Sequence, residues 1–285
     1  MTPMDVSIII VNYNTKHLLN DCLKSVFAQT RGVTYEVIVV DNASSDGSQD
    51  MIKAEFPEVR LIESEKNIGF GRANNLAMEV AKGDYFFLLN SDTILRNNAI
   101  KIFYDFSIKN HDTGVLGSIL YDASESPSHS YGYFPTTKRL YKDIVFRIAS
   151  LFHKFRDYPH REISEPCNVE YITGADLWIP RRIYEQTGGF DPQFFLYYEE
   201  TDLQKRMAIK GVPRILIPGP KILHLEGGSQ SGSVISPRRL SQFYKSQDIY
   251  INKYASGIKG LIFKITYRPL KNLYLFLAGL KCTKQ

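Results

Sequence analysis

The first 120 residues repeat one cycle, in which an apolar run rich in β-branched residues is followed by a turn and then by apolar positions at helical spacing. Five runs have the composition of strands: VSIIIV (6–11), YEVIVV (35–40), VRLIES (59–64), DYFFLL (84–89) and TGVLGSIL (113–120). Uninterrupted apolar strands that alternate with helices are typical of a parallel sheet with both faces covered. The sequence therefore predicts an α/β fold with a Rossmann-like, mostly parallel sheet and helices on both faces.

The apolar content, the cysteines and the lengths of the apolar stretches exclude several classes of protein. With 285 residues and 44% apolar content, the chain can bury the core of one large or two small domains. Its three cysteines, Cys22, Cys167 and Cys282, are odd in number and lack CxxC spacing, which favours neither a disulfide framework nor a zinc site and fits a reducing compartment. The N-terminus does not have the pattern of a signal peptide, and no stretch reaches 18 uncharged apolar residues, so we expect no membrane-spanning helix.

Polar residues follow the first four predicted strands at their carboxyl ends. These segments are Asn12-Tyr13-Asn14, Asp41 to Gly47, Glu65-Lys66-Asn67 and Asn90-Ser91-Asp92. Ligands of open α/β sheets bind beyond the carboxyl ends of the strands, so four polar ends predict a binding site there. The alternative for any single segment is that its polar residues begin a loop or cap a helix.

The stretch IGFGRANNLAM (68–78) stands where the third strand gives way to a helix. A helix N-terminus with Arg72 beside it can bind an anion such as a diphosphate. The alternative is that Gly69 and Gly71 only form the turn and that Asn74 and Asn75 are surface polar residues.

Beyond residue 120 the alternation of strand and helix patterns ends. We expect residues 121–168 to form a long loop-like excursion over the open end of the sheet.

Two further groups could carry chemistry. Asp92 and His224 each follow a predicted strand, and together they could hold a divalent cation, Mg²⁺ or Mn²⁺, that also binds a ligand's phosphates. Glu199, Glu200 and Asp202 follow directly after an aromatic run, and carboxylates partly desolvated by rings gain proton affinity that suits a general base. The alternative is that these acids favour the first turn of a helix over 199–210.

Six or seven blocks, in order, resemble family 2 glycosyltransferases, most closely the rhamnosyltransferase-like branch. They are VSIIIVNYNTKHLLNDCLKSVFAQT, EVIVVDNASSDGS, NIGFGRANNLAM, LLNSDTIL, TGADLWIPRR and GGFDPQFFLYYEETDLQKR followed by ILHLEGGS. The resemblance extends from residue 5 to about residue 230. It implies a glycosyltransferase-A type fold and a metal-dependent enzyme that takes a nucleotide-diphosphate sugar as its donor.

The resemblance also implies roles for individual residues. Asn12, Asn14 and Asp41 match positions that hold the nucleotide base and ribose, and Arg72 matches a segment beside the diphosphate. The metal-binding Asp-x-Asp of the family is Asn90-Ser91-Asp92 here, so only Asp92 keeps its carboxylate, and His224 matches the third metal position.

The catalytic base of the family is the second acid of a Glu-Asp pair, which is Glu200 here, with Asp202 as the second candidate. The resemblance implies inverting transfer, in which this base deprotonates an acceptor hydroxyl. Glu199 and Trp178 are the predicted acceptor contacts, Trp178 by stacking on a sugar ring, although a core position for this tryptophan is an equal alternative.

We therefore expect a catalytic domain over residues 1–236, with a donor-binding half to about residue 120 and an acceptor half over about 121–236, and a basic amphipathic C-terminal tail over 237–285. The expected reaction transfers rhamnose from dTDP-rhamnose to a glycan or lipid-linked glycan in cell-surface polysaccharide synthesis. A sugar-1-phosphate nucleotidyltransferase is the competing enzyme, but it should have a phosphate loop rich in glycine and lysine after the first strand. The non-enzymatic alternative is a carbohydrate-binding protein, which the Asn90 and Glu200 departures allow.

The tail contains ten Lys or Arg residues against Asp248 alone, a net charge of +9, which leaves −4 for residues 1–236. Apolar residues recur at helical spacing on each side of Pro269; they are Ile258, Leu261, Ile262 and Ile265, then Leu270, Leu273, Tyr274 and Leu277. We expect Pro269 to separate two short apolar faces that dock the enzyme on the cytoplasmic face of an anionic membrane, with no nucleic acid as partner. The alternative is that both faces pack onto the enzyme's own domain.

Overall fold

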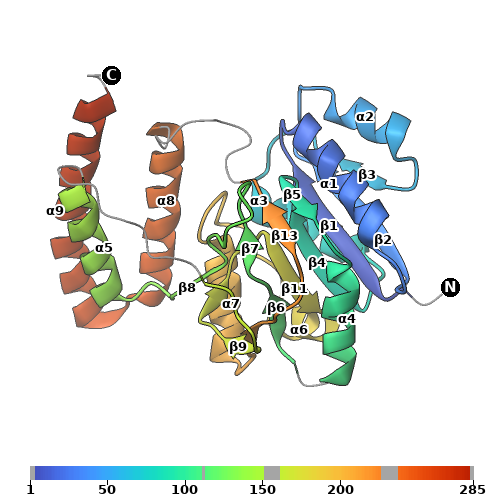
Figure 1. Ribbon diagram of the computed structural model, residues 1–285. Helices are drawn as coiled ribbons and strands as arrows, with labels where there is room; N and C mark the ends of the chain where they lie inside the picture. Colours follow the sequence, from blue (N-terminus) through green and yellow to red (C-terminus); the bar gives the residue numbers. More distant parts are fainter. Residues whose placement is uncertain (1–3, 111–112, 151–160, 226–236, 283–285) are drawn as a thin grey trace. The chain divides into compact units, whose positions relative to one another are not determined.

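The computed structural model describes residues 4–110, 113–150, 161–225 and 237–282. The chain divides into two compact units, one formed by Met1–Tyr133 with His160–Ser233 and the other by Phe134–Pro159 with Val234–Gln285. The first unit contains the predicted sheet, and the described part of the second unit consists of three helices (Figure 1).

The first unit is built on an eight-stranded sheet with the order β3-β2-β1-β4-β11-β6-β12-β9 (Figure 1). Its strands are β1 Val6–Asn12, β2 Tyr35–Asp41, β3 Arg60–Glu63, β4 Tyr85–Asn90, β6 Val115–Gly117, β9 Cys167–Asn168, β11 Asp176–Pro180 and β12 Arg214–Leu216. The four strands from β3 to β4 run parallel, whereas β11 pairs antiparallel with both β4 and β6. The mostly parallel sheet is therefore as predicted, with β11 inserted between the fourth and fifth predicted strands.

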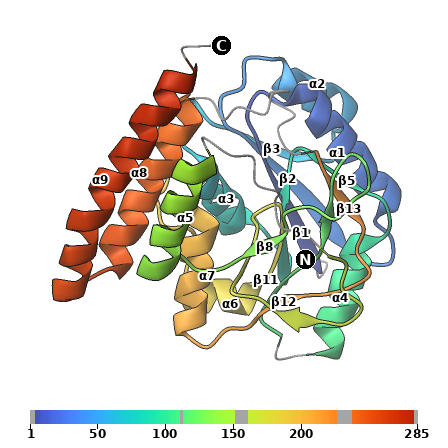
Figure 2. The same cartoon turned by 60° about the vertical axis from the view of Figure 1, so that its left-hand side comes forward.

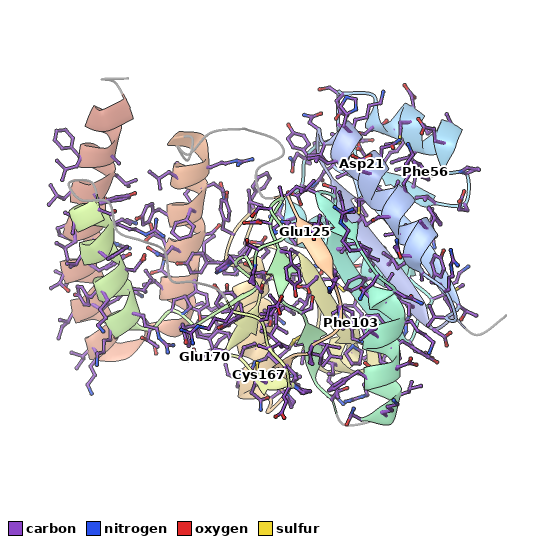
Figure 3. All side chains as sticks on the ribbon, viewed as in Figure 1. Asp21, Phe56, Phe103, Glu125, Cys167 and Glu170 are labelled. Carbon is purple, nitrogen blue, oxygen red and sulfur yellow. The ribbon has the colours of Figure 1, made fainter. Side chains whose placement is uncertain are left out.

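Helices cover both faces of this sheet. They are α1 Lys16–Gln29, α2 Ser48–Glu55, α3 Phe70–Val80, α4 Ala99–Lys109, α6 Arg181–Thr187 and α7 Glu199–Ile209. Ile8 and Ile10 pack in one core cluster with α1, α2 and α4, while Ile9 packs in a second cluster with α3, α6 and α7. Alternate strand residues point to opposite faces, so the continuous apolar run of β1 is explained by burial on both sides. Phe56 and Phe103 belong to the first cluster (Figure 3).

Two small sheets extend the first unit. One has the order β5-β13-β7, formed by Thr93–Leu95, Ile222–His224 and Leu120–Tyr121, and the other pairs β8 Tyr131–Gly132 with β10 Tyr171–Ile172. Pairing of β13 with β5 sets His224 opposite Thr93. Residues 131 positions apart in sequence thereby lie side by side just beyond the end of β4.

The second unit contains α5 Thr137–Ser150, α8 Pro237–Tyr254 and α9 Gly257–Cys282 (Figure 2). Its core is formed by residues of all three helices: Leu140, Ile144, Tyr244, Ile251, Phe263 and Tyr267. We expected residues 121–168 to cross over the sheet, but the part from residue 134 to 159 belongs with the C-terminal helices instead. The reason is that α5 buries Leu140 and Ile144, one helical turn apart, in that separate core.

The prediction that Pro269 separates two helical segments is wrong, because α9 continues through it. A proline removes one helical hydrogen bond and crowds the preceding turn. Side chains on both sides, Phe263 and Tyr267 before it and Leu270 and Tyr274 after it, pack the two halves against the same core. No helix in the described segments is long and apolar enough to span a bilayer.

Candidate active site

The carboxyl ends of β1 and β2 are joined through Asn12 and Asp41, both fully buried. The Asn12 Nδ2 donates to Asp41 Oδ2 at 2.8 Å and to Ser44 Oγ at 3.0 Å. The other oxygen of Asp41 accepts from the Ser44 backbone N–H at 2.8 Å and from Gln49 Nε2 at 2.7 Å. Asp41 therefore shapes the loop after β2, and its predicted contact with a nucleotide base stays a prediction.

Asn14 lies at the exposed rim of the same site, in a left-handed backbone conformation with φ of 53°. Its backbone N–H donates to Ser44 Oγ at 2.9 Å, and its side-chain oxygen accepts from the Ser45 N–H at 2.8 Å. Asparagine tolerates this conformation better than most residues. The loops after β1 and β2 thus form one hydrogen-bonded rim in which Asn14 is accessible to a ligand.

Asn90, Asp92 and His224 converge beyond β4. His224 Nε2 lies 3.3 Å from Asp92 Oδ1 and 3.4 Å from Asn90 Nδ2. The Leu225 N–H donates to the Asp92 carbonyl at 2.9 Å, which fixes the two strands in this register. Among the residues that the structure describes, no group of three or more His, Cys, Asp or Glu side chains could hold a metal ion.

The pair of Asp92 and His224 nevertheless fits a divalent cation that takes its remaining ligands from a bound diphosphate. Mg²⁺ sites of this kind commonly use one or two protein carboxylates together with substrate phosphates and water. An imidazole nitrogen and a carboxylate oxygen are both suitable donors for Mn²⁺. The donor set of Asp92 and His224 is therefore adequate, and Asn90 lies beside it where the family pattern has a second carboxylate.

Asp176 is a buried carboxylate that the sequence analysis did not select, although it begins the otherwise apolar run of β11. Its Oδ2 accepts from both the backbone N–H and the hydroxyl of Ser118 at 2.7 Å. Its Oδ1 is buried and has no hydrogen-bond partner in the part of the chain that the structure describes. Burial raises the pKa of Asp176 to about 7, against a smaller opposing effect of the two Ser118 bonds and of His224.

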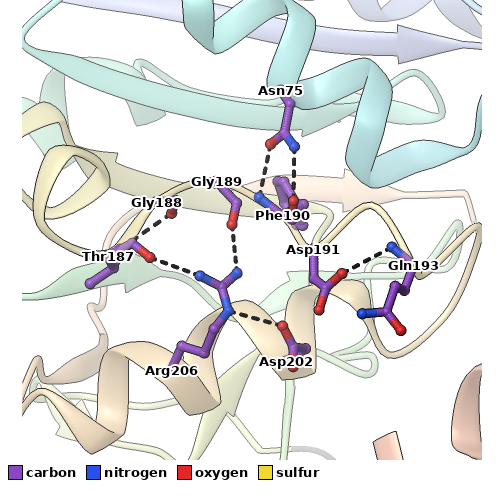
Figure 4. A network of polar contacts seen from close by, with 9 residues as sticks. All are labelled: Asn75, Thr187, Gly188, Gly189, Phe190, Asp191, Gln193, Asp202 and Arg206. Atoms are coloured by element: carbon purple, nitrogen blue, oxygen red, sulfur yellow. Dashed lines mark hydrogen bonds and ion pairs between the residues drawn. The ribbon is translucent and has the colours of Figure 1, made fainter. Parts of the chain in front are cut away.

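The stretch 68–78 binds the loop that precedes α7. The Asn75 carboxamide donates to the Phe190 carbonyl and accepts from the Phe190 N–H, both at 2.8 Å (Figure 4). Arg72 Nε donates to the Pro192 carbonyl at 2.8 Å, and the Phe70 N–H donates to the Phe195 carbonyl at 3.0 Å. In this structure Arg72 thus contacts protein backbone, and its predicted role beside a diphosphate stays a prediction.

Gly69 is required by this contact. Its φ is +91°, and a β-carbon there would lie 2.3 Å from the Phe195 carbonyl oxygen. No other residue combines that backbone conformation with so close an approach. The glycine therefore serves the docking of residues 190–195 against the start of α3.

The loop delivers Glu199 and Glu200 to the first turn of α7. Tyr197 and Tyr198 before them both have φ of 68°, a conformation that costs free energy in bulky residues and is typical of functional sites. Burial raises the pKa of both glutamates, and the charge of Glu200 raises that of Glu199 further. Among the described residues, the Oε2 atoms of both are buried and have no hydrogen-bond partner. Glu199 is 4% exposed, whereas Glu200 is partly accessible, so Glu200 is the better placed to meet a substrate.

Asp202 has a different environment. It is fully buried, and its Oδ2 accepts from Arg206 Nε at 3.0 Å. Arg206 also donates to the Thr187 carbonyl at 2.8 Å and to the Gly189 carbonyl (Figure 4). Asp202 thereby anchors the turn after α6, which disfavours it as a base.

Trp178 requires a correction. It is fully buried and stacks on Tyr85 and Phe103, with ring centroids 5.1 and 5.6 Å apart. The indole lies in the core on the face of the sheet that α1 and α4 cover. It cannot stack on a sugar ring, because alternation along β11 directs it to the face of the sheet that α4 covers, where it is fully buried.

The cation pair and the glutamates lie at the same end of the sheet. The Asn90 N–H donates to the Ala175 carbonyl at 3.1 Å, and a β-carbon on the adjacent Gly174 would lie 3.7 Å from that of Glu200. The short turn before β11 therefore connects the end of β4 with the start of α7.

Comparison with known proteins agrees with this arrangement. Residues 7–187 match the model of glycosyl transferase family 2. The N-acetylglucosaminyl-diphospho-decaprenol L-rhamnosyltransferase of Mycobacterium tuberculosis is 26% identical over 78% of this chain and 76% of its own length. The poly(ribitol-phosphate) beta-N-acetylglucosaminyltransferase TarP of Staphylococcus aureus is 29% identical over 39% of this chain and 36% of its own.

Solved structures show the fold. S. aureus TarS 1-349 in complex with UDP-GlcNAc superposes with a TM-score of 0.58 and 15% identity over 90% of this chain and 68% of that one. GalNAc-T7 with UDP, GalNAc and Mn²⁺ superposes with a TM-score of 0.61 and 16% sequence identity, over 94% of this chain and 55% of that one. The predicted glycosyltransferase-A fold is confirmed, and neither the nucleotidyltransferase nor the non-catalytic alternative is favoured. The chain belongs to glycosyl transferase family 2.

Proposed function

We propose that this glycosyltransferase moves rhamnose from dTDP-rhamnose, with inversion at the anomeric carbon, to a lipid-linked glycan acceptor in cell-surface polysaccharide synthesis. The observation that carries the proposal is the short path from the pair of Asp92 and His224, through the turn at Gly174 and Ala175, to the half-buried residue Glu200. At this end of the sheet, a leaving diphosphate can be bound near Asp92 and His224 while an acceptor hydroxyl lies near Glu200.

Glu200 acts as the base. Burial raises the pKa of Glu200, so its carboxylate form is a stronger base toward an acceptor hydroxyl than the carboxylate of an exposed glutamate. The hydroxyl oxygen attacks the anomeric carbon as the bond from that carbon to the diphosphate oxygen breaks. The electron pair of that bond leaves with the nucleoside diphosphate. Glu199, buried beside the base, lies on the acceptor side of the site, and burial together with the charge of Glu200 raises its pKa, which favours its protonated form.

Asp92 and His224 would hold the divalent cation, with Asn90 beside them. When bound, such a cation neutralises the charge that develops on the departing diphosphate. Asn12, Asn14 and Asp41 form the nucleotide end of the site, and Arg72 lies on the diphosphate side at the start of α3. If Arg72 donated its hydrogen bonds to a phosphate oxygen in place of the Pro192 carbonyl, it could bind the donor without a movement of α3.

The choice of sugar and acceptor rests on the mycobacterial relative, whose name specifies rhamnosyl transfer to a polyprenyl-diphosphate-linked sugar. A lipid-linked acceptor requires the enzyme to work at a membrane surface. We therefore place it on the cytoplasmic face of an anionic membrane, held peripherally by the C-terminal helices.

The direct test incubates the protein with Mn²⁺ and a panel of labelled sugar nucleotides and measures slow hydrolysis of the donor. Hydrolysis of dTDP-rhamnose above that of UDP-sugars supports the proposal, and full activity in EDTA contradicts the role given to Asp92 and His224. Preference for a UDP-sugar would keep the transferase and change the donor. Absence of turnover with every donor would contradict the enzymatic function.

A further inference from the structure

Helix α9 has two apolar faces on opposite sides. The inner face packs into the core of the second unit through Phe263 and Tyr267, together with Leu270 and Tyr274. The outer face is exposed, and we call it the α9 stripe: Ile258, Leu261, Ile262, Ile265, Pro269, Leu273 and Phe276. Steps of three or four residues connect its members, so they form one continuous band about 27 Å long.

The α9 stripe is unusual for a surface that faces water. Ile258 is 79% exposed, Ile265 is 62% exposed and Phe276 is 64% exposed. Single exposed apolar residues are ordinary, but a contiguous band of large ones marks a surface that binds something. The inner face already buries its own aromatic residues, so the stripe is not needed for the core of this unit.

Charge identifies the occupant. Lys259 lies on one side of the stripe and Lys264 and Arg268 on the other, as their helical spacing requires. Asp248, the one acidic residue in 237–285, is bonded by Lys271 of the inner face at 2.6 and 2.7 Å. The outer cations therefore have no acidic residue of the tail to neutralise them.

We infer that the α9 stripe is the membrane-contacting surface of the protein, with α9 lying in the headgroup plane of an anionic bilayer. An apolar band flanked by cations inserts its side chains to the acyl boundary, while the lysine and arginine stems extend to the phosphates. A second copy of the chain is a poorer fit, because an isologous contact would bring the same cations together. The inference rests on the proposed function for its purpose, which is access to a lipid-linked acceptor.

The test is flotation of the full chain with phosphatidylcholine vesicles, with and without phosphatidylglycerol. The wild type is expected to float with the anionic vesicles and to lose binding as salt is raised. The double variant Leu261→Glu/Ile262→Glu should bind at least about tenfold more weakly, because two inserted side chains are lost. Both positions are exposed, so the helix content measured by circular dichroism should not change.

Matched control variants distinguish binding through the α9 stripe from nonspecific binding of the protein to vesicles. Ile209→Glu changes an equally exposed isoleucine of α7 in the first unit and should leave flotation unchanged. Lys259→Gln/Arg268→Gln should reduce binding to anionic vesicles, whereas Lys24→Gln/Lys109→Gln, at exposed positions of α1 and α4, should not.

Wild-type protein that does not float, or a stripe variant that floats as well as wild type, would overturn the inference. So would a stripe variant that only converts a dimer to a monomer, since the occupant would then be a second copy. Hydrolysis of the donor in vesicle-free buffer is measured in parallel. Flotation that depends on the α9 stripe, without turnover of any donor, would support the membrane-contacting surface and refute the proposed function. Donor turnover without flotation that depends on the stripe would support the proposed function and refute the membrane-contacting surface.

Discussion

The carboxamide of Asn75 satisfies both backbone polar groups of Phe190, with its nitrogen and its oxygen each 2.8 Å from the partner atom. The two residues are 115 positions apart, and the bonds tie the exposed side of α3 to the loop that leads into α7. Because Arg72 binds the same loop at Pro192 and the Phe70 N–H binds it at Phe195, the backbone that presents Glu200 is held from α3 at three points.

Asn75→Asp should therefore disturb the base without contacting substrate. The carboxylate would face the Phe190 carbonyl, so one hydrogen bond becomes a repulsion, and the free energy of unfolding should fall by roughly 1–3 kcal/mol. Turnover of the donor should fall by at least about tenfold with little change in donor affinity, because the loop shifts but the nucleotide end does not. Steady-state kinetics checks this prediction.

Asn110→Asp is the matched control, since Asn110 donates to a backbone carbonyl at 2.9 Å within the last turn of α4, outside the site described above. It should leave turnover unchanged. Equal loss of turnover in the two variants would show that the bonds of Asn75 have no particular connection with Glu200.

Metal binding should depend on both members of the cation pair. Asp92→Asn removes the charge and His224→Gln removes the imidazole donor, and each should weaken Mn²⁺ binding by at least about tenfold. Calorimetric titration of Mn²⁺ in the presence of nucleoside diphosphate measures this, with Asp21→Asn at an exposed position of α1 as the control. Unchanged affinity in both site variants would place the cation elsewhere.

Asp176 should make the protein less stable as pH rises. Its folded pKa of about 7 lies above its ordinary value of 3.8, so the folded state holds the extra proton between these values. The stabilisation is complete below about pH 4 and is lost as pH rises through about 7, with a difference of up to ~4 kcal/mol.

Asp176→Asn should abolish that part of the pH dependence, since the amide oxygen can still accept both Ser118 bonds and carries no proton to lose. Urea unfolding at about pH 5 and about pH 8 compares the two proteins. A wild type whose stability rises with pH relative to Asp176→Asn would contradict the assignment.

Much of the fold could be predicted because its signals are local. The predicted strands 6–11 and 35–40 end one residue before β1 and β2, and the predicted strand 84–89 is displaced from β4 by one residue, since each is an apolar run bounded by polar turns. The position of β11 between β4 and β6 could not be predicted, because strand order is decided by packing between distant segments. The same holds for α5, whose periodicity indicates a helix but not the core that it joins.

Within the site, the sequence indicated candidate residues by their type, but it did not indicate which residues far apart in the chain contact one another. Asp92, His224 and the acidic cluster at 199–202 were selected as candidates because acidic or imidazole groups follow strands or aromatic runs, and Glu200 was chosen within that cluster from the family resemblance. Asp176 was missed since its partner Ser118 is 58 residues away, and Trp178 was misplaced because nothing in the sequence says which side of β11 faces α4.

The acidity of Glu200 predicts the pH profile of the reaction. Because burial raises its pKa above the ordinary 4.5, the carboxylate form needed in a base becomes available only at higher pH. The rate kcat/KM should therefore rise with pH along a limb whose midpoint lies above 4.5. A rate that falls over that range would contradict a base of this kind.

The most direct test of the account is the rate of dTDP-rhamnose turnover by Glu200→Gln beside Asp202→Asn. The glutamine keeps the shape and cannot accept a proton, so kcat should fall by roughly 10²–10⁴-fold while donor affinity stays about the same. Asp202→Asn should mainly lower the thermal midpoint, because it leaves Arg206 without its buried partner. Full turnover by Glu200→Gln, with turnover lost in a folded Asp202→Asn protein, would contradict Glu200 as the base.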